Sequence, residues 1–209
     1  GAEMKAEIIA VGTEILLGDI LNTNAQYLSK ELAQLGIEVY FQTVVGDNPK
    51  RLKDTIFQAF SRADLIITTG GLGPTEDDLT KETAAEYFGE ELVLDERALG
   101  RIEKYFKRTG RTMTENNRKQ AMVPKEHGIV LYNDNGTAPG IIMEKNGKII
   151  AMLPGPPKET MPMFENQVKP YLQKKQEYTF VSEILRVASV GESAMETLVK
   201  DIIDAQTNP

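Results

Sequence analysis

Three glycines follow one of the most apolar stretches of the chain, in the run Thr-Gly-Gly-Leu-Gly-Pro-Thr of residues 69–75. Glycines after a buried strand let the backbone turn tightly and point amide N–H groups at an anion. The run therefore predicts a phosphate cradle that contains Gly70, Gly71 and Gly73, with Thr75 at its end. It lacks the Gly-Lys-Ser/Thr of a Walker A loop and the Gly-x-Gly-x-x-Gly of a dinucleotide fingerprint, so it matches neither motif.

An acidic run, Glu76-Asp77-Asp78, continues directly from these glycines. Carboxylates beside a phosphate would repel it unless a cation lies between them. We therefore predict that Asp78 and Asp77 bind a divalent metal ion, with Glu14 as a further ligand. A cap on the next helix, worth about 1 kcal/mol, is the alternative role for one of these aspartates. For Glu14 the alternatives are contact with a ribose hydroxyl and a solvated loop position.

The composition excludes several classes of site. The 209 residues contain no cysteine and one histidine, so a Ser-His-Asp triad and sites of several His or Cys ligands cannot be built within one chain. A metal must then have oxygen ligands, which suits Mg²⁺. The formal charge of -7 disfavours nucleic acid and anionic membranes as partners. No apolar run approaches the ~20 residues of a membrane span, and we expect a cytoplasmic protein in which His127 is structural.

Alternating strands and helices must position these residues. Apolar runs at 6–12, 37–45 and 64–69 predict strands, and the segments between them have helical spacing. Two such crossovers predict a mostly parallel sheet with helices on both faces, an α/β fold of three layers. Ligands of such sheets bind at the carboxyl ends of the strands. Those ends are predicted in residues 12–18, 45–48 and 70–78.

The remaining segments predict further helices, a hairpin and an incomplete tail. Helices are expected at 79–88, 95–108 and 114–122, and from Pro156 to about Gln173. Asn146-Gly147 joins two strands of residues 141–153, as in a type I′ hairpin. After Gln176 we expect a strand, Thr179–Val190, and a helix, Glu192–Ala205. These two elements cannot close a core alone, so the tail predicts a homodimer.

Three motifs carry a resemblance to a known family. They are the run of residues 69–80, Val-Gly-Thr-Glu-Ile-Leu-Leu-Gly-Asp at 11–19 and Leu-Pro-Gly-Pro-Pro-Lys-Glu at 153–159. In this order and spacing the chain resembles the CinA family. Residues 4–171 resemble its amino-terminal domain, which is similar to the molybdopterin-binding fold of MogA and MoeA. Residues 172–209 resemble the beginning of the CinA middle region.

The resemblance implies an activity. A CinA-like domain of this kind implies hydrolysis of ADP-ribose to AMP and ribose 5-phosphate, with a divalent metal ion (Mg²⁺, Mn²⁺ or Co²⁺) and potassium as a further cation. Nothing in the sequence matches the nicotinamide mononucleotide deamidase domain of complete CinA proteins, so we expect this chain to lack it. The other expectations are pterin binding or adenylylation, as in MogA-like proteins, and a non-catalytic nucleotide-binding module.

The resemblance also implies roles for individual residues. Asp47 and Asp78 fall on the two functional aspartates of MogA-like proteins, and Lys158 is expected to steady the leaving phosphate. Leu72 stands where the pterin enzymes commonly have threonine, which disfavours pterin chemistry. Asn117 could meet phosphates or be an ordinary helix residue. The predicted substrate-binding residues are Gly12, Thr13, Gly70, Gly71, Gly73, Thr75, Asn117, Gly136, Gly140, Pro154 and Gly155.

Overall fold

The fold is taken from a computed structural model, which describes residues 3–189 and 192–207, without the side chains of 192–195 and 207. The chain divides into two compact units. One is Met4–Val168, and the other is Lys169–Pro209 together with the first three residues. The first unit contains every residue for which a site role was predicted.

A six-stranded sheet forms the centre of the first unit, in the order β2-β1-β3-β8-β7-β6. Strands β2, β1, β3 and β8 run parallel, whereas β7 is antiparallel to both of its neighbours. The predicted mostly parallel α/β fold is confirmed. The strands are β1 (Lys5–Val11), β2 (Glu38–Val45), β3 (Leu65–Thr69), β6 (Gly128–Leu131), β7 (Gly140–Lys145) and β8 (Lys148–Leu153).

The strands that carry the glycine loops are buried on both faces. All five residues of β3 are buried, as are the last six of β1 and the last five of β8. Burying such apolar stretches contributes about 25 cal/mol per Å². The near-continuous apolar pattern is typical of strands covered by helices on both sides.

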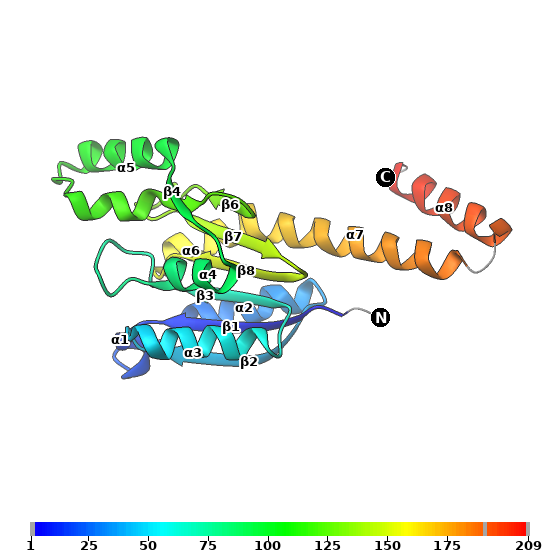
Figure 1. Cartoon of the computed structure of the whole chain (residues 1–209), viewed down its shortest axis with the longest axis horizontal. Helices are drawn as coiled ribbons and strands as arrows, with labels where there is room; N and C mark the ends of the chain where they lie inside the picture. The colour runs from blue at the N-terminus through cyan, green and yellow to red at the C-terminus, as the bar shows by residue number, and fades with distance from the viewer. Residues whose placement is uncertain (1–2, 190–191, 208–209) are drawn as a thin grey trace. The chain divides into compact units, whose positions relative to one another are not determined.

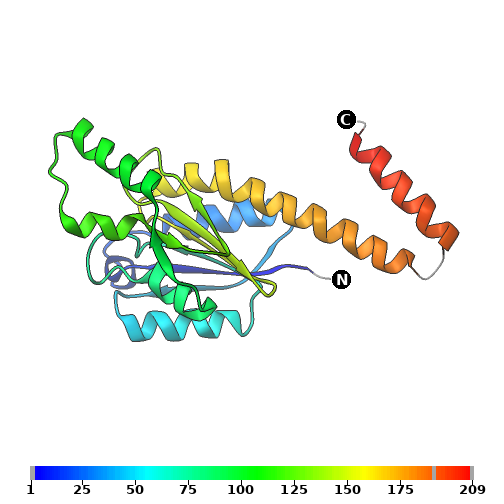
Figure 2. The same cartoon turned by 45° about the horizontal axis from the view of Figure 1, so that its top comes forward.

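Helices cover both faces of this sheet (Figures 1 and 2). One face packs against α3 and α4, and α2 lies on the opposite face. Asn48 caps α3 by accepting a hydrogen bond from the Arg51 amide (3.0 Å), and Pro49 follows at the first helical position. The helices are α1 (Thr13–Leu16), α2 (Thr23–Gln34), α3 (Pro49–Phe60), α4 (Thr80–Phe88), α5 (Glu96–Thr109), η1 (Glu115–Ala121), α6 (Pro157–Met163) and η2 (Phe164–Val168).

The predicted hairpin is confirmed. Asn146 and Gly147 both have positive φ values, 52° and 76°, as a type I′ turn requires. Three short strands were missed, because runs of three or four residues show little periodicity. Two of them, β4 (Leu92–Leu94) and β5 (Met122–Pro124), form a separate antiparallel pair, and the third is β6.

The prediction of a strand at Thr179–Val190 was wrong. Residues up to Ala188 belong to the long helix α7 (Lys169–Ala188), while Val190 lies outside the described residues. The apolar residues Phe180, Ile184 and Val187 are spaced by four and three positions, which is helical spacing and does not alternate as a strand would. The predicted helix that follows is α8 (Glu192–Thr207).

In the described parts of the chain, no helix combines the length and the apolar character that crossing a bilayer requires.

Candidate functional site

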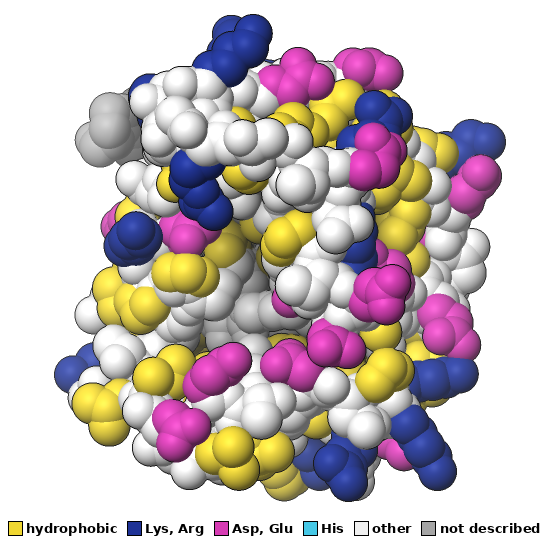
Figure 3. All heavy atoms as spheres, turned by 90° about the vertical axis from the view of Figure 1, so that its left-hand side faces the viewer, with side chains coloured by type: hydrophobic (Ala, Val, Ile, Leu, Met, Phe, Trp, Pro, Cys, Tyr) yellow, Lys and Arg dark blue, Asp and Glu magenta, His cyan; other side chains and the backbone are white. Residues whose placement is uncertain are grey.

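The predicted site residues gather at the carboxyl edge of the sheet. Parallel strands β1, β2, β3 and β8 all end there, so the loops that follow them share one face of the molecule. The turn between β6 and β7 lies at the same edge, because β6 runs parallel to β8. Figure 3 views this face and shows a central hollow of mostly backbone and uncharged polar atoms, with acidic side chains along its lower rim.

The glycine loop after β3 has no room for side chains at its first two glycines. Gly70 and Gly71 have φ values of +93° and +74°, which side chains rarely allow. A Cβ at Gly70 would lie 2.2 Å from the carbonyl oxygen of Val11, and one at Gly71 would lie 1.9 Å from Oγ1 of Thr80. The Thr80 hydroxyl in turn donates to the Gly70 carbonyl (3.0 Å). Only glycine therefore fits this turn, as the sequence predicted.

The loop leaves amide donors available. Leu72 is buried in the core and anchors the loop between two glycines. The amides of Gly71 and Gly73 have no acceptor within the described part of the chain, and neither residue is fully buried. An accessible N–H group without a partner is a ready donor to an anion.

Asp78 turns its carboxylate back onto this loop. Its Oδ2 accepts hydrogen bonds from the Thr75 amide (3.0 Å) and hydroxyl (2.7 Å). A Cβ at Gly73 would lie 2.7 Å from the same oxygen. Lys119 holds the loop from outside, because its Nζ donates to the carbonyl oxygens of Thr75 and Asp78. Asp77, by contrast, is exposed.

Asp47 and Thr13 are brought together from two neighbouring strands. The Asp47 carboxylate lies 3.3 Å from the Thr13 hydroxyl and 3.4 Å from its amide, and the Asp47 amide donates to that hydroxyl (3.2 Å). Both amide–carboxylate and hydroxyl–carboxylate bonds are long, so the carboxylate keeps capacity for other partners. Gly12 is buried beside them, and a Cβ there would meet the Glu14 carboxylate at 3.0 Å.

The Leu-Pro-Gly loop after β8 lies against the glycine loop. The position for a Cβ at Gly155 is 3.6 Å from the Cα of Gly70. The Gly155 carbonyl accepts a hydrogen bond from Nδ2 of Asn24 (2.7 Å), and Pro154 is held through its carbonyl by the Thr160 hydroxyl. Lys158, at the start of α6, is exposed.

Asn117 and the turn after β6 have structural contacts. Asn117 caps its own short helix by accepting from the Thr114 amide (2.9 Å), and its Nδ2 donates to Gln120 (3.0 Å). A Cβ at Gly140 would lie 2.5 Å from Sδ of Met163, so this glycine serves close packing. A Cβ at Gly136 would lie 1.9 Å from the Glu159 carboxylate, which places this turn beside α6.

Oxygen ligands for a metal are spread along this edge. Within the described residues, no three Asp, Glu, His or Cys side chains converge on a point that could hold a metal ion. Glu14, Asp77 and Asp78 thus do not form a cage of their own. A Mg²⁺ ion commonly binds one or two carboxylates and completes its coordination with water and substrate phosphates. The donor set fits that kind of site.

Sequence reasoning missed the burial of three polar residues beside the loops, Asn24, Thr69 and Lys81. Asn24 leaves its Oδ1 buried and without a partner in the described part of the chain, and so does the hydroxyl of Thr69. Lys81 is only 5% exposed, and its Nζ donates to the Lys119 carbonyl (2.7 Å). Burial lowers the pKa of Lys81 to about 8, opposed by the attraction of Glu82. Asn24 and Lys81 lie inside predicted helices, and the sequence offered no signal that they are buried.

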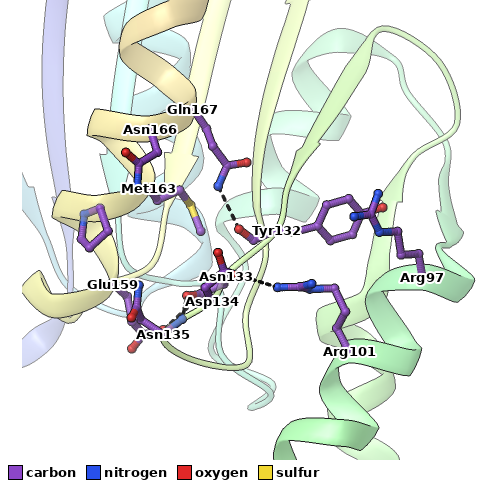
Figure 4. A pocket seen from close by; sticks show the side chains of 11 residues that line it. Arg97, Arg101, Tyr132, Asn133, Asp134, Asn135, Glu159, Met163, Asn166 and Gln167 are labelled. Carbon is purple, nitrogen blue, oxygen red and sulfur yellow. Dashed lines mark hydrogen bonds and ion pairs between the residues drawn. The ribbon is translucent and has the colours of Figure 1, made fainter.

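A cavity of about 310 Å³ was also missed. It opens between α5, the turn after β6 and α6, and Figure 4 shows Arg97, Arg101, Tyr132 and Glu159 around it. Its residues are distant in sequence. No single motif could have revealed it.

Similar proteins of known sequence and structure identify the family of this chain. Residues 7–174 match the family model described as "Probable molybdopterin binding domain". The crystal structure of the protein CinA from Thermoplasma acidophilum is 36% identical, with a TM-score of 0.72, and the match covers 80% of this chain and 98% of that one. The chain belongs to the CinA family.

Longer relatives agree with this membership. A "Putative competence-damage inducible protein" of Clostridium beijerinckii is 59% identical to the CinA-family chain over 206 residues. That match covers 99% of this chain and 50% of the relative, so the chain spans about half the length of the curated relatives it matches.

The fold itself is shared more widely. The molybdopterin biosynthesis enzyme MoaB of Thermus thermophilus is 21% identical, with a TM-score of 0.51 over 78% of the CinA-family chain and 87% of MoaB. At this identity the likeness concerns the fold alone.

Proposed function

We propose that this CinA-family chain hydrolyses a nucleoside diphosphate sugar, with ADP-ribose as substrate and AMP and ribose 5-phosphate as products. One observation carries the proposal. The glycine loop presents amides of Gly71 and Gly73 that have no acceptor in the described chain, next to the carboxylate of Asp78. Such a loop suits a pyrophosphate, whose developing negative charge it can stabilise during hydrolysis.

Two further observations support a ligand at this edge. Buried polar atoms nearly always have hydrogen-bond partners, so the unpartnered oxygens of Asn24 and Thr69 call for an explanation. Thr69 immediately precedes the glycine loop, and Asn24 holds the Gly155 carbonyl beside it. Hydroxyl groups or water at a bound ligand could donate to both oxygens.

Separate residues have separate roles in the proposed hydrolysis. Water attacks one phosphorus, the bridging P–O bond breaks, and the bridging oxygen leaves with the other phosphate. Asp47 orients this water and accepts its proton, since its carboxylate keeps free capacity beside Thr13. Lys158 steadies the departing phosphate.

A divalent cation fits the carboxylates of this edge. Asp78 would hold it, with Asp77 or Glu14 as further ligands and the substrate phosphates completing its coordination. When bound, such an ion neutralises charge on the phosphate oxygens and makes a water molecule more acidic. Potassium would act as an additional cation.

The experiment incubates the purified chain with ADP-ribose and Mg²⁺, Mn²⁺ or Co²⁺, with and without K⁺, and measures AMP by chromatography. We expect metal-dependent AMP release that Asp78→Asn lowers at least about 100-fold, as loss of a group acting on transition-state charge does. The matched control is Asp54→Asn, an exposed position of α3, which should keep the wild-type rate. Equal rates for Asp78→Asn and the wild type at limiting metal would remove Asp78 from the mechanism.

A second candidate is molybdopterin binding, which the family match over residues 7–174 favours. Leu72 opposes it, because its side chain is buried in the core and offers the loop no hydroxyl. Pterin binding without AMP release would select this candidate. Nucleotide binding without turnover would indicate a non-catalytic module instead.

A further inference from the structure

The cavity between α5 and α6 (Figure 4) includes the turn after β6, which lies at the same edge of the sheet as the glycine loops. The turn that follows β6 lines one part of it, and residues of α6 and η2 line another. Its volume of about 310 Å³ is at the lower end of the range for small-molecule sites. Most of the residues around it are polar or charged, so its ligand should be hydrophilic.

Two arginines of α5 form one wall of the cavity. The guanidinium of Arg97 lies 4.2 Å from the centre of the Tyr132 ring and has no carboxylate partner among the described residues. Arg101 lies 5.5 Å from the same ring and pairs with Asp134, which is exposed. The Tyr132 hydroxyl donates to Asp95 (2.9 Å), and this bond fixes the ring. The tyrosine thus holds two guanidinium groups at the cavity, and guanidinium is well suited to phosphate.

The opposite wall offers neutral and acidic hydrogen-bonding groups. Asn133 donates from Nδ2 to Oε1 of Glu159 (2.7 Å), and burial raises the pKa of the Glu159 carboxyl. Asn166 projects from η2 toward the same space in Figure 4. Carboxylate and amide groups of this kind bind sugar hydroxyls.

One segment of the chain, residues 153–159, connects the glycine loop to the cavity. Glu159 follows Lys158 in the segment that begins with the Leu-Pro-Gly loop, and Gly155 of that segment lies against Gly70. On the other side, a Cβ at Gly136 would lie 1.9 Å from the Glu159 carboxylate. A ligand held by the glycine loop could therefore extend along this segment into the cavity.

We propose that this cavity binds the phosphorylated ribose end of the substrate, with Arg97 and Arg101 toward its phosphate and Glu159, Asn133 and Asn166 toward its hydroxyls. A nucleobase fits less well, because the guanidinium of Arg97 covers the Tyr132 ring that a base would stack on. This assignment rests on the proposed hydrolysis, and it names the part of the substrate that each region binds.

The experiment measures binding of ribose 5-phosphate and of AMP to the full chain by calorimetry. For Arg97→Gln/Arg101→Gln we expect the Kd of ribose 5-phosphate to rise at least about tenfold, since hydrogen bonds to charged groups are the stronger ones. The Kd of AMP should stay unchanged, and ribose without phosphate should bind the wild type more weakly. The control is Arg108→Gln, which removes the same charge from α5 but lines only a neighbouring cavity.

Several outcomes would overturn the assignment: no binding of ribose 5-phosphate to the wild type, an equal loss in the control, or an equal loss of AMP binding. If the double variant unfolds, the same binding measurement is made with Arg97→Gln alone, which breaks no ion pair. Failure of the proposed hydrolysis is distinguishable, because it would abolish AMP release yet leave arginine-dependent binding of ribose 5-phosphate. If AMP is released but the arginine substitutions leave the Kd of ribose 5-phosphate unchanged, the assignment of the cavity is rejected and the proposed hydrolysis is retained.

Discussion

The ammonium of Lys119 donates a hydrogen bond to the carbonyl oxygen of Thr75, with the two atoms 2.6 Å apart and the two residues 44 positions apart in sequence. It also donates a hydrogen bond to the carbonyl oxygen of Asp78, so one side chain holds both ends of the segment 75–78. We expect Lys119→Met to cost about 1–2 kcal/mol of stability, as loss of a charge-assisted bond does. We also expect it to loosen the loop and lower the rate of AMP release.

Hydrogen exchange of residues 71–79, measured with the rate of AMP release, checks this expectation. Lys119→Arg retains the charge and several donors, so it should restore part of both properties. Unchanged exchange and an unchanged rate in Lys119→Met would show that the loop holds its shape without this contact.

The crowding at Gly71 predicts that even a methyl side chain lowers both stability and nucleotide binding. In Gly71→Ala, the Cβ would lie 1.9 Å from Oγ1 of Thr80, so the loop must shift. Strain from the positive φ costs about 1–2 kcal/mol, and overpacking adds about 1–3 kcal/mol. Gly89→Ala is the matched control, because Gly89 also has positive φ (+67°) but nothing within 4 Å of its Cβ position.

Chemical denaturation of both variants separates strain from crowding. Gly71→Ala should be the less stable and should also lose nucleotide binding, whereas Gly89→Ala should bind as the wild type does. Equal stabilities and equal affinities would mean that the loop tolerates a side chain.

Lys81 predicts a particular dependence of stability on pH. Its pKa falls from an ordinary 10.5 to about 8 in the folded chain, chiefly through burial. Between these values the unfolded chain binds more protons than the folded one, so the free energy of unfolding rises with pH. The slope for one group reaches at most about 1.4 kcal/mol per pH unit.

Comparison with Lys81→Met isolates this contribution. The free energy of unfolding of the wild type should increase relative to the variant as pH rises from about 8 to 10.5. Other lysines contribute to both proteins and cancel in the difference. Parallel curves would indicate that Lys81 titrates normally.

The region after Gln176 still predicts self-association, although the strand on which the expectation was built is a helix. Tyr178, Phe180 and Val187 of α7 are each more than 60% exposed, and exposed apolar surface of this kind often marks an interface. We expect light scattering to give the mass of a dimer for the full chain and the mass of a monomer for a chain ended at Gln173. A monomeric full chain would contradict the prediction.

Local signals predicted the sheet and its turns. Asn146-Gly147 determines backbone geometry by itself, so its turn could be recognised without any tertiary contact. The region of Thr179–Val190 was misassigned because the helical spacing of Phe180, Ile184 and Val187 was interpreted as a strand.

The position of the candidate site was predictable where it follows from contiguous sequence or from strand order. The glycine loop and the pairing of Asp47 with the first loop follow from strand order. Burial of Lys81 and the joining of Arg97 to Tyr132 depend on how distant elements pack, which no local pattern contains.

The blocked Cβ positions at Gly70 and Gly71 have an evolutionary consequence. Main-chain donors are the same whatever side chains surround them, so under the proposed function this loop would bind phosphate without distinguishing between phosphate esters. Descendants of such a domain would change their substrates by altering the neighbouring walls and leaving the turn intact. Selectivity among relatives should therefore diverge at positions such as Arg97 and Glu159, while the glycines persist.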